Sequence, residues 1–429
     1  MQAQFIDNNV LYSQHNFHLP LDYQQADSQQ IQVFTRELVA LDKQDDDLPW
    51  LVYLQGGPGF EGPRASASSG WLKRALQQYR VLLLDQRGTG QSSAINHQSL
   101  AHLTPSEQAL YLSHFRADNI VRDAEAIRAL LGIEKWATLG QSFGGFCTLT
   151  YLSLFPRSLL HCFITGGIPS IKRSADQVYQ ATYQRVTDKN KAFFVQFPHA
   201  QFLCQEIASF LSKNTVLLPN GQKFTVEQLQ LIGINLGRGN ANIGLYMLLE
   251  SAFINVNGNK QLSYSFLNQM QQEQSYLTNP IYALLHEQIY NQGEASNWSA
   301  HRVRDEFPQF NYASGDNFYF TGEMVYPWMF EQLATLKPLQ AAAQLLAEKQ
   351  DWGQLYDASI LANNQVPVAC AVYADDMYVE FDYSRETLAN IGNSKAWITN
   401  EYEHNGLGVD GEKILGRLIE MVQSIKNLP

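Results

Sequence analysis

Residues 138–152, TLGQSFGGFCTLTYL, place a serine between closely spaced glycines, where one apolar segment gives way to another. The residues before the serine have the short apolar pattern of a buried strand, and those after it have the length and composition of a helix. Gly140, Ser142 and Gly144 form the pattern G-x-S-x-G, which in a strand–turn–helix setting indicates a nucleophile elbow. An ordinary Gly-Ser turn can contain the same residues, so the interpretation depends on their surroundings.

Strands and helices alternate around this motif. Helical patterns cover residues 119–132 and 143–155, and apolar strand patterns cover residues 31–38, 49–55, 80–86, 135–140 and 159–167. Such alternation predicts an α/β fold with a largely parallel sheet covered by helices on both faces. The two opening strand patterns, residues 31–38 and 49–55, stand before the first helix, which predicts an antiparallel edge.

The rest of the chain divides into two parts. Residues 169–364 have long helical patterns rich in Gln, Tyr and Phe, and they are followed by two more strand patterns and an amphipathic helix at residues 411–428. We therefore expect one α/β domain made of residues 1–168 and 365–429. Residues 169–364 would be inserted into it as a mainly helical cap, or lid.

The composition is that of a globular protein, with 45% hydrophobic and 17% charged residues. The net charge of -11 argues against a surface for nucleic acid or an anionic membrane. No segment reaches the roughly 18 apolar residues of a membrane span, and the N-terminus lacks a secretory pattern, so we expect a cytoplasmic protein. The four cysteines are too dispersed for a zinc site or a disulfide framework. No pattern indicates an oligomeric state.

A nucleophilic serine needs two oxyanion donors, a base, and an acid that orients the base. Residues 56–59, GGPG, end a strand in a glycine-rich turn, so the expected oxyanion donors are the backbone N–H groups of Gly57 and Phe143. In an elbow of this type the acid follows the serine along the chain, and the histidine follows the acid. His404 lies beyond the last block of strands and is the expected base.

The acid is expected at the end of the strand that precedes this histidine. Asp375 and Asp376 both stand there, in the stretch VACAVYADDMYVE. Glu401 and Glu403 are too near His404 in sequence to orient it easily from a separate strand.

Five stretches together resemble the prolyl aminopeptidase (proline iminopeptidase) branch of the α/β-hydrolases: QGGPGF, LLDQRGTGQSS, GQSFGGF, YADDMY and EHNG. The family patterns are H-G-G-P-G, D-Q-R-G-x-G-x-S, G-x-S-x-G-G, an Asp at a strand end and a late His. The match runs through the whole predicted sheet domain in order. The length is similar to that of the subgroup of about 400 residues with an enlarged lid.

Two departures from the family patterns concern the site. Gln55 stands where the family usually has a histidine, which leaves the backbone donors intact but removes a side chain that supports the loop. The acid lies in Asp-Asp-Met, and alignment on Met377 selects Asp376, with Asp375 as the alternative. The resemblance also implies that Asp85 and its neighbours Gln86 and Arg87 are mainly architectural.

The resemblance implies a serine exopeptidase that removes an N-terminal proline from small peptides, with no cofactor and no metal. Such an enzyme must recognise the protonated α-amine, so carboxylates should project from the lid toward the serine. Glu323 and Glu250 stand in apolar surroundings and are the candidates, although intraprotein salt bridges would also explain them. Four lid aromatics could form the pocket for the pyrrolidine ring or could belong to the lid core: Phe318, Tyr319, Tyr326 and Trp328.

Two other functions are compatible with these residues. An esterase or amidase could use the same triad with a lid suited to other acyl groups. A non-catalytic binding protein could share the fold, but it has no need of a serine, an acid and a histidine in this order.

Overall fold

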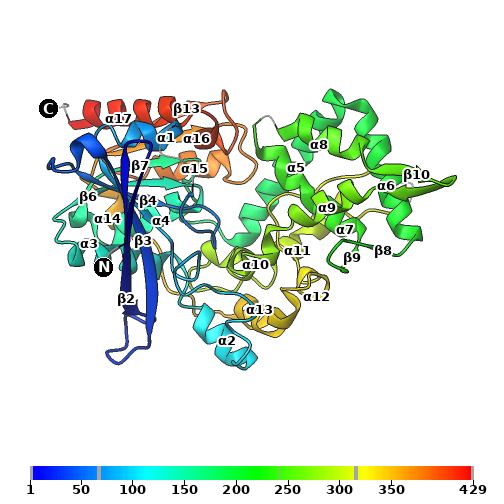
Figure 1. Cartoon of the computed structure of the whole chain (residues 1–429), viewed down its shortest axis with the longest axis horizontal. Helices are drawn as coiled ribbons and strands as arrows, with labels where there is room; N and C mark the ends of the chain where they lie inside the picture. Colours follow the sequence, from blue (N-terminus) through cyan, green and yellow to red (C-terminus); the bar gives the residue numbers. More distant parts are fainter. Residues whose placement is uncertain (1–2, 65–68, 240, 314–316, 427–429) are drawn as a thin grey trace.

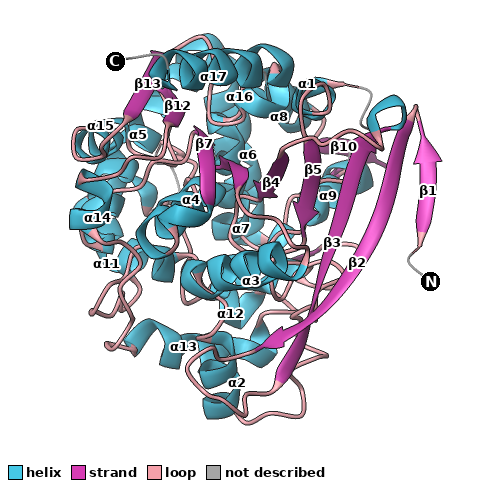
Figure 2. Cartoon of the chain, turned by 90° about the vertical axis from the view of Figure 1, so that its left-hand side faces the viewer, coloured by secondary structure: helices cyan, strands magenta, loops and turns pink. Residues whose placement is uncertain are grey.

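The computed structural model describes residues 3–64, 69–239, 241–313 and 317–426. Within them nine strands form one sheet in the order β1-β2-β3-β5-β4-β6-β7-β12-β13 (Figure 2). The strands are β1 (Gln4–Asp7), β2 (Val10–Pro20), β3 (Gln30–Ala40), β4 (Trp50–Leu54), β5 (Arg80–Leu84), β6 (Trp136–Gln141), β7 (Leu159–Thr165), β12 (Val368–Tyr373) and β13 (Ser394–Thr399). The predicted α/β architecture is confirmed.

Strands β4, β5, β6, β7, β12 and β13 are parallel, whereas β1, β2 and β3 join them by antiparallel pairs. An antiparallel edge is present as predicted, but of the two opening strand patterns only that of residues 31–38, now β3, belongs to it, because β4 is a parallel strand inside the sheet. The other two strands of the edge, β1 and β2, were not revealed by the sequence pattern. β2 is half-buried and includes Ser, Gln, His and Asn, and all four residues of β1 are exposed. Strands at an edge need no apolar run, because one side of each remains open to solvent.

Helices cover both faces of the sheet. Helices α1 (Gly70–Ala75) and α17 (Gly411–Lys426) pack on one face, and α3 (Ala117–Leu130) and α4 (Phe143–Leu154) pack on the other (Figure 2). Successive side chains of β4 point to opposite faces of the sheet, which explains why its sequence is apolar throughout. Leu51 packs in the core beneath α1 and α17, and Val52 packs in the core beneath α3 and α4. A strand buried on both faces reads as a continuous hydrophobic run.

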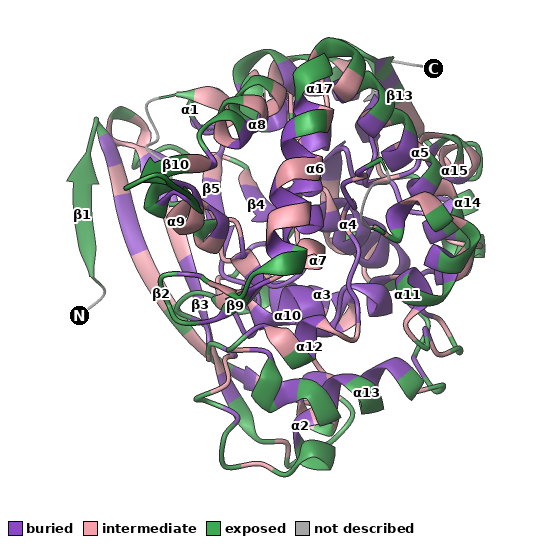
Figure 3. Cartoon of the chain, turned by 90° about the vertical axis from the view of Figure 1, so that its right-hand side faces the viewer, coloured by how far each residue is buried: buried purple, intermediate pink, exposed green. Residues whose placement is uncertain are grey.

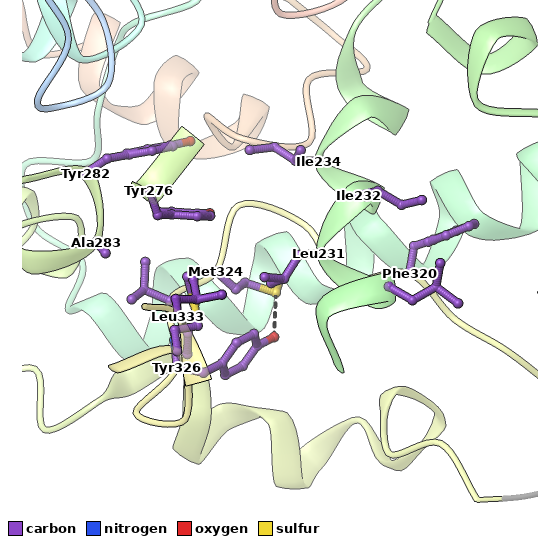
Figure 4. Close-up of a cluster of buried hydrophobic side chains, with 14 of the residues drawn as sticks. Leu231, Ile232, Ile234, Tyr276, Tyr282, Ala283, Phe320, Met324, Tyr326 and Leu333 are labelled. Carbon is purple, nitrogen blue, oxygen red and sulfur yellow. Dashed lines mark hydrogen bonds between the residues drawn. The ribbon is translucent and has the colours of Figure 1, made fainter. Parts of the chain in front are cut away.

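The cap lies beside the sheet domain and is mainly helical (Figure 1). Its longer helices are α5 (Ala175–Gln196), α6 (Pro198–Lys213), α8 (Ala241–Glu250) and α9 (Tyr264–Gln272), and two small hairpins pair β8 (Val216–Leu217) with β9 (Lys223–Phe224) and β10 (Phe253–Val256) with β11 (Asn259–Leu262). Viewed from the cap side, β10 is mostly exposed (Figure 3). Tyr276, Tyr282, Met324 and Tyr326 are part of its apolar core (Figure 4).

The last part of the predicted cap segment returns to the sheet domain. Helix α14 (Ala358–Ala362) packs against α4, and Leu355 and Leu361 belong to the apolar core on that face of the sheet. None of the described helices is both long and apolar enough to cross a membrane.

Three cations of the cap form ion pairs with the C-terminal part of the sheet domain. Arg173 pairs with Glu386 at 2.8 Å, Arg185 with Glu380 at 2.7 Å, and Lys189 with Glu403 at 2.6 Å. Two of the three cations belong to α5, so this helix is attached to the domain that it covers. Partly exposed pairs each contribute only about 0.2–1 kcal/mol, so their main effect is to orient the helix.

Candidate active site

Ser142 occupies the turn between β6 and α4 and has a strained backbone. Its φ of 55° and ψ of -125° lie in a region that residues with a side chain rarely adopt. Such a conformation costs about 1–3 kcal/mol and persists only where the surroundings impose it. The Ser142 N–H donates to the Thr165 carbonyl at 3.0 Å, which ties the turn to the end of β7.

The glycines around Ser142 allow main chains to touch. A Cβ at Gly140 would stand 2.3 Å from the Gly144 carbonyl oxygen, and a Cβ at Gly144 would stand 1.9 Å from the Leu54 carbonyl oxygen. A Cβ at Gly145 would stand 2.1 Å from the oxygen of Gly167. No side chain fits at these positions, so the G-x-S-x-G-G pattern is a steric requirement of the turn.

Three side chains from distant parts of the chain form a continuous hydrogen-bonded array. His404 Nε2 lies 2.9 Å from Ser142 Oγ, and His404 Nδ1 lies 2.6 Å from Asp376 Oδ2. Asp376 is 1% exposed and follows β12, while His404 is 9% exposed and follows β13. This arrangement can move a proton from the serine hydroxyl to an imidazole whose other nitrogen is held by a carboxylate.

Of the two adjacent acids, Asp376 faces the histidine. Its second oxygen, Oδ1, accepts hydrogen bonds from the backbone N–H groups of Tyr378 at 2.8 Å and Val379 at 3.1 Å. Asp375 is exposed to solvent. The two backbone bonds fix the Asp376 carboxylate, which in turn fixes the orientation of the His404 ring.

The pKa of His404 is raised above its ordinary value. Burial alone lowers the pKa, but the charge of Asp376 and the hydrogen bond to it raise the pKa by more, and the charge of Glu323 adds to the rise. The positive charge of Arg238 acts in the opposite direction. The imidazole therefore stays protonated to a higher pH than a free histidine does, and it becomes a base only above that pH.

The glycine-rich turn after β4 lies beside the elbow and is held from both sides. The Gln86 side chain donates to the Gln55 carbonyl at 3.0 Å, and from the cap Asn279 donates to the Gly59 carbonyl at 3.0 Å. Gly57 lines the same cavity as Ser142. The N–H of Phe143 lies in the first turn of α4, where no carbonyl of the helix can accept it.

Asp85 and Gln86, which follow β5, hold the segment that contains this turn. Asp85 is buried, and its carboxylate accepts hydrogen bonds from the Gly62 N–H at 3.0 Å, the Gln91 N–H at 2.9 Å and the Arg64 guanidinium at 2.9 Å. Its oxygens are thus fully used within the protein.

A cavity of about 310 Å³ opens above Ser142 between the sheet domain and the cap. The sheet domain contributes Gln55, Gly56, Gly57, Phe60, Gln141, Ser142, Tyr378, His404 and Asn405, and the cap contributes Ile234, Arg238, Ser275, Tyr282 and Glu323. Phe60 and Tyr282 meet edge to face with their ring centroids 5.0 Å apart. The cavity thus combines the hydrogen-bonded Ser142 with aromatic walls and two charges of opposite sign.

Among the described residues, Glu323 provides the carboxylate that the cap contributes to the cavity. Its side chain is 17% exposed and accepts a hydrogen bond from the Tyr282 hydroxyl. His286 Nε2 is 3.8 Å from the other carboxylate oxygen, but burial lowers the pKa of His286 despite the opposing effect of Glu323. A neutral His286 leaves the negative charge of Glu323 unmatched by a cation at this contact.

Glu250, the second predicted carboxylate of the lid, does not fit this role. It is the last residue of α8 and is exposed, and within the described residues it is not part of the cavity lining. The helix is apolar overall, but only Leu245 and Leu249 are buried along it. An acidic residue at the end of a helix can turn to solvent without unfavourable burial.

The four predicted pocket aromatics also lie elsewhere. Phe318 packs against Phe320, Tyr319 packs against Phe310, and Trp328 stacks on Tyr326. The Tyr326 hydroxyl is 2.8 Å from that of Tyr183. These rings build the core of the cap, which is the alternative that their sequence pattern allowed.

The aromatic side chains that do line the cavity are Phe60, Tyr282 and Tyr378. Phe60 directly follows the GGPG turn and Tyr378 lies two residues after Asp376, so proximity to the predicted motifs was an available signal. Tyr282 and Arg238 come from short cap segments with no such signal. Among the described residues, no group of three or more His, Cys, Asp or Glu side chains is placed to hold a metal ion.

Replacing Gly144 by alanine should disrupt the elbow. The added methyl group would overlap the Leu54 carbonyl, and the backbone on either side cannot move without breaking the contact, so we expect a loss of about 3 kcal/mol or more in the free energy of unfolding. Gly244→Ala in α8 is a matched control, since its Cβ would meet open space and should stabilise the protein by up to about 1 kcal/mol. Urea unfolding measures both, and equal stability of Gly144→Ala and the unmodified protein would contradict the steric argument.

The reactivity of Ser142 toward a fluorophosphonate should depend on the protonation of His404. Because the His404 pKa is raised, the labelling rate should increase with pH through a midpoint above about 6.5. Glu323→Gln removes a charge that raises this pKa, so its midpoint should fall, whereas Glu250→Gln should leave the midpoint unchanged. A midpoint that stays constant or rises in Glu323→Gln would show that Glu323 is not electrostatically coupled to His404.

Comparison with known proteins places this chain in a family. The family model of the alpha/beta hydrolase fold matches residues 49–239. A proline iminopeptidase of Aeromonas sobria is 62% identical over 409 residues, which cover 95% of each chain. A proline iminopeptidase of Aspergillus aculeatus is 34% identical over 419 residues, which cover 95% of this chain and 93% of the relative.

A solved structure of a proline iminopeptidase from Mycobacterium smegmatis aligns with 96% of this chain and 98% of its own, at 13% identity and a TM-score of 0.47. The sequence relatives carry the assignment, because they match almost the whole chain at high identity. The chain therefore belongs to the proline iminopeptidase family of the alpha/beta hydrolase fold.

Proposed function

We propose that this protein is a serine exopeptidase that releases an N-terminal proline from small peptides through a prolyl-enzyme intermediate. The observation that carries the proposal is the hydrogen-bonded array of Asp376, His404 and Ser142, which opens into a cavity that also contains Glu323. The relatives at 62% and 34% identity are both named proline iminopeptidases, which supports the same activity here.

The first half of the reaction forms the acyl-enzyme. His404 Nε2 takes the proton of Ser142 as Oγ attacks the prolyl carbonyl carbon, and the carbonyl π electrons move to oxygen. The N–H groups of Gly57 and Phe143 hold this oxyanion. When the tetrahedral intermediate collapses, the C–N bond breaks and the His404 imidazolium gives its proton to the departing amine. Asp376 keeps the ring oriented and stabilises its positive charge.

The second half hydrolyses the prolyl ester. A water molecule replaces the departed peptide, gives a proton to His404 Nε2 and attacks the ester carbon. The same backbone donors hold the second oxyanion, and Ser142 leaves with the proton from His404. Proline is released and the serine hydroxyl is restored, so the protein groups suffice for the whole cycle.

Recognition of the N-terminus would depend on Glu323. The secondary ammonium of an N-terminal proline carries two N–H donors and a positive charge, and a partly buried carboxylate binds such a group more strongly than a neutral amide. An internal peptide bond offers no charge at this position, so Glu323 favours the chain end. Phe60, Tyr282 and Tyr378 would provide apolar contact for the pyrrolidine ring.

We also propose a cytoplasmic location. The four cysteines are free and buried, which suits a reducing compartment.

Ser142→Ala should abolish hydrolysis of prolyl arylamides. Loss of the nucleophile removes the covalent route, so kcat should fall by roughly 10⁴-fold or more. A panel of aminoacyl arylamides assayed with both proteins measures the change and the preference for proline together. Retained activity in the folded variant would refute the proposed chemistry. Equal activity of the unmodified enzyme on all aminoacyl arylamides of the panel would refute the proposed selectivity.

Glu323→Gln should separate amine recognition from acyl transfer. Removing the charge should lower kcat/KM on prolyl arylamides by roughly 10- to 100-fold, because a hydrogen bond between charged groups contributes about 1.5–3 kcal/mol. Hydrolysis of an ester without an amine should change little, and Glu250→Gln should behave like the unmodified enzyme on both substrates. An equal loss on ester and arylamide would assign Glu323 a structural role instead.

A further inference from the structure

Among the described residues that line the cavity above Ser142, Arg238 is the one with a positively charged side chain. It follows the short helix η3 (Leu231–Gly237) of the cap and is exposed to solvent. It lines the same cavity as Ser142 and Glu323. A guanidinium and a carboxylate thus line the same small cavity as Ser142.

The backbone around Arg238 is fastened to the loop that carries the catalytic histidine. The His404 N–H donates to the Gly237 carbonyl at 3.3 Å, and the Gly239 N–H donates to Asn405 Oδ1 at 3.0 Å. Gly237 is also in close contact with Tyr378, since a Cβ there would stand 2.3 Å from the tyrosine ring. Arg238 therefore keeps its position relative to the reacting atoms.

The side chain of Arg238 is oriented but not neutralised. Its Nη1 donates to Asn235 Oδ1 at 3.3 Å, and the guanidinium hydrogen-bonds the Tyr378 hydroxyl. Both partners are uncharged, and within the described part of the chain no Asp or Glu forms an ion pair with Arg238. By contrast, the nearby cap cations Arg185 and Lys189 are each paired with a carboxylate. A guanidinium has five N–H donors, so Arg238 keeps donors for a further acceptor.

Arg238 lies where the cavity above Ser142 adjoins a second hollow. Arg238, Ile234 and Ser275 line both the cavity above Ser142 and a second hollow of about 120 Å³ in the cap, which does not include Ser142 or Glu323. A substrate whose amine is held at Glu323 and whose carbonyl is at Ser142 must extend its next residue away from Glu323. Arg238 lines the second hollow as well as the cavity, so it is available to a residue that extends in that direction.

We propose that Arg238 binds the C-terminal carboxylate of the leaving residue, so that the preferred substrates are prolyl dipeptides with a free carboxylate. This inference rests on the proposed function. The amine would pair with Glu323 and the carboxylate with Arg238, and the scissile bond would lie between the two contacts. Guanidinium and carboxylate form two parallel hydrogen bonds in the most favourable geometry, which fixes the leaving residue as well as binding it.

The test compares prolylglycine with prolylglycine amide, which differ in charge at the carboxyl end. The unmodified enzyme should show a kcat/KM at least roughly tenfold higher for the free acid. Arg238→Gln should bring this ratio close to one, and Arg238→Lys should retain part of it. Lys213→Gln, which removes a positive charge from the exposed end of α6, should keep the full ratio. All assays should run well above the His404 pKa, since Arg238 lowers that pKa.

Prolyl arylamide, which has no carboxylate, distinguishes the possible failures. Arg238→Gln should lower kcat/KM less for the arylamide than for prolylglycine, and an equal loss on both substrates would indicate a structural role and overturn the inference. A ratio near one in the unmodified enzyme, or an unchanged ratio in Arg238→Gln, would also overturn it while arylamide cleavage leaves the proposed function intact. If the unmodified enzyme cleaves no prolyl substrate, the proposed function itself fails. Prolyl tripeptides cleaved better than the dipeptide would show that the carboxylate of the leaving residue is not the ligand.

Discussion

Where β6 turns into α4, the backbone of the turn lies directly against the backbone at the end of β4 and after β7, and the site depends on this contact. Gly144 touches the Leu54 carbonyl at the end of β4, while Gly145 touches the backbone of Gly167 after β7. The turn is therefore enclosed by the two strands that flank β6 in the sheet. That enclosure holds Ser142 in its left-handed conformation, in which the hydroxyl projects into the cavity rather than into the sheet.

The other reactive groups are positioned by the same sheet. Asp376 and His404 follow β12 and β13, which extend the sheet beyond β7, so all three side chains project from the carboxyl ends of parallel strands. Backbone hydrogen bonds hold Asp376 from one side and His404 holds it from the other. The pKa of His404 is raised because the strand order brings Asp376 next to it, and Glu323 of the cap raises this pKa further.

Those parts of the site that end regular strands could be predicted from the sequence, and those that come from the cap could not. Ser142 and Asp376 each follow a strongly apolar strand, His404 follows the partly apolar edge strand β13, and the order of elements along an α/β sheet indicates which ends meet. The cap has no comparable periodicity. Glu250 and Glu323 both stand among apolar residues in the sequence. Their composition therefore does not distinguish them, whereas the position of Glu250 at the end of α8 directs it to solvent.

The same limit explains the aromatic residues and the edge strands. An aromatic cluster packs equally well in a core or in a pocket, so Tyr326 could not be distinguished from Tyr282 by its neighbours in sequence. Strands β1 and β2 were missed because an edge that is open to solvent does not need an apolar run. Family resemblance, by contrast, was carried by short motifs in the sheet domain, and the relatives confirm it.

The bonds between the cap and the His404 loop have a consequence for how this enzyme can diversify. The His404 N–H is bonded to the cap carbonyl of Gly237, and the adjacent Glu403 is paired with Lys189 of α5. A cap joined only by its two connections could be exchanged between relatives as a module. Here the cap also supports the loop that carries His404, so replacing it would disturb the array of Ser142, His404 and Asp376 together with the wall of the cavity. New substrate ranges should therefore arise through single substitutions on the inner surface of the cap, with its framework retained.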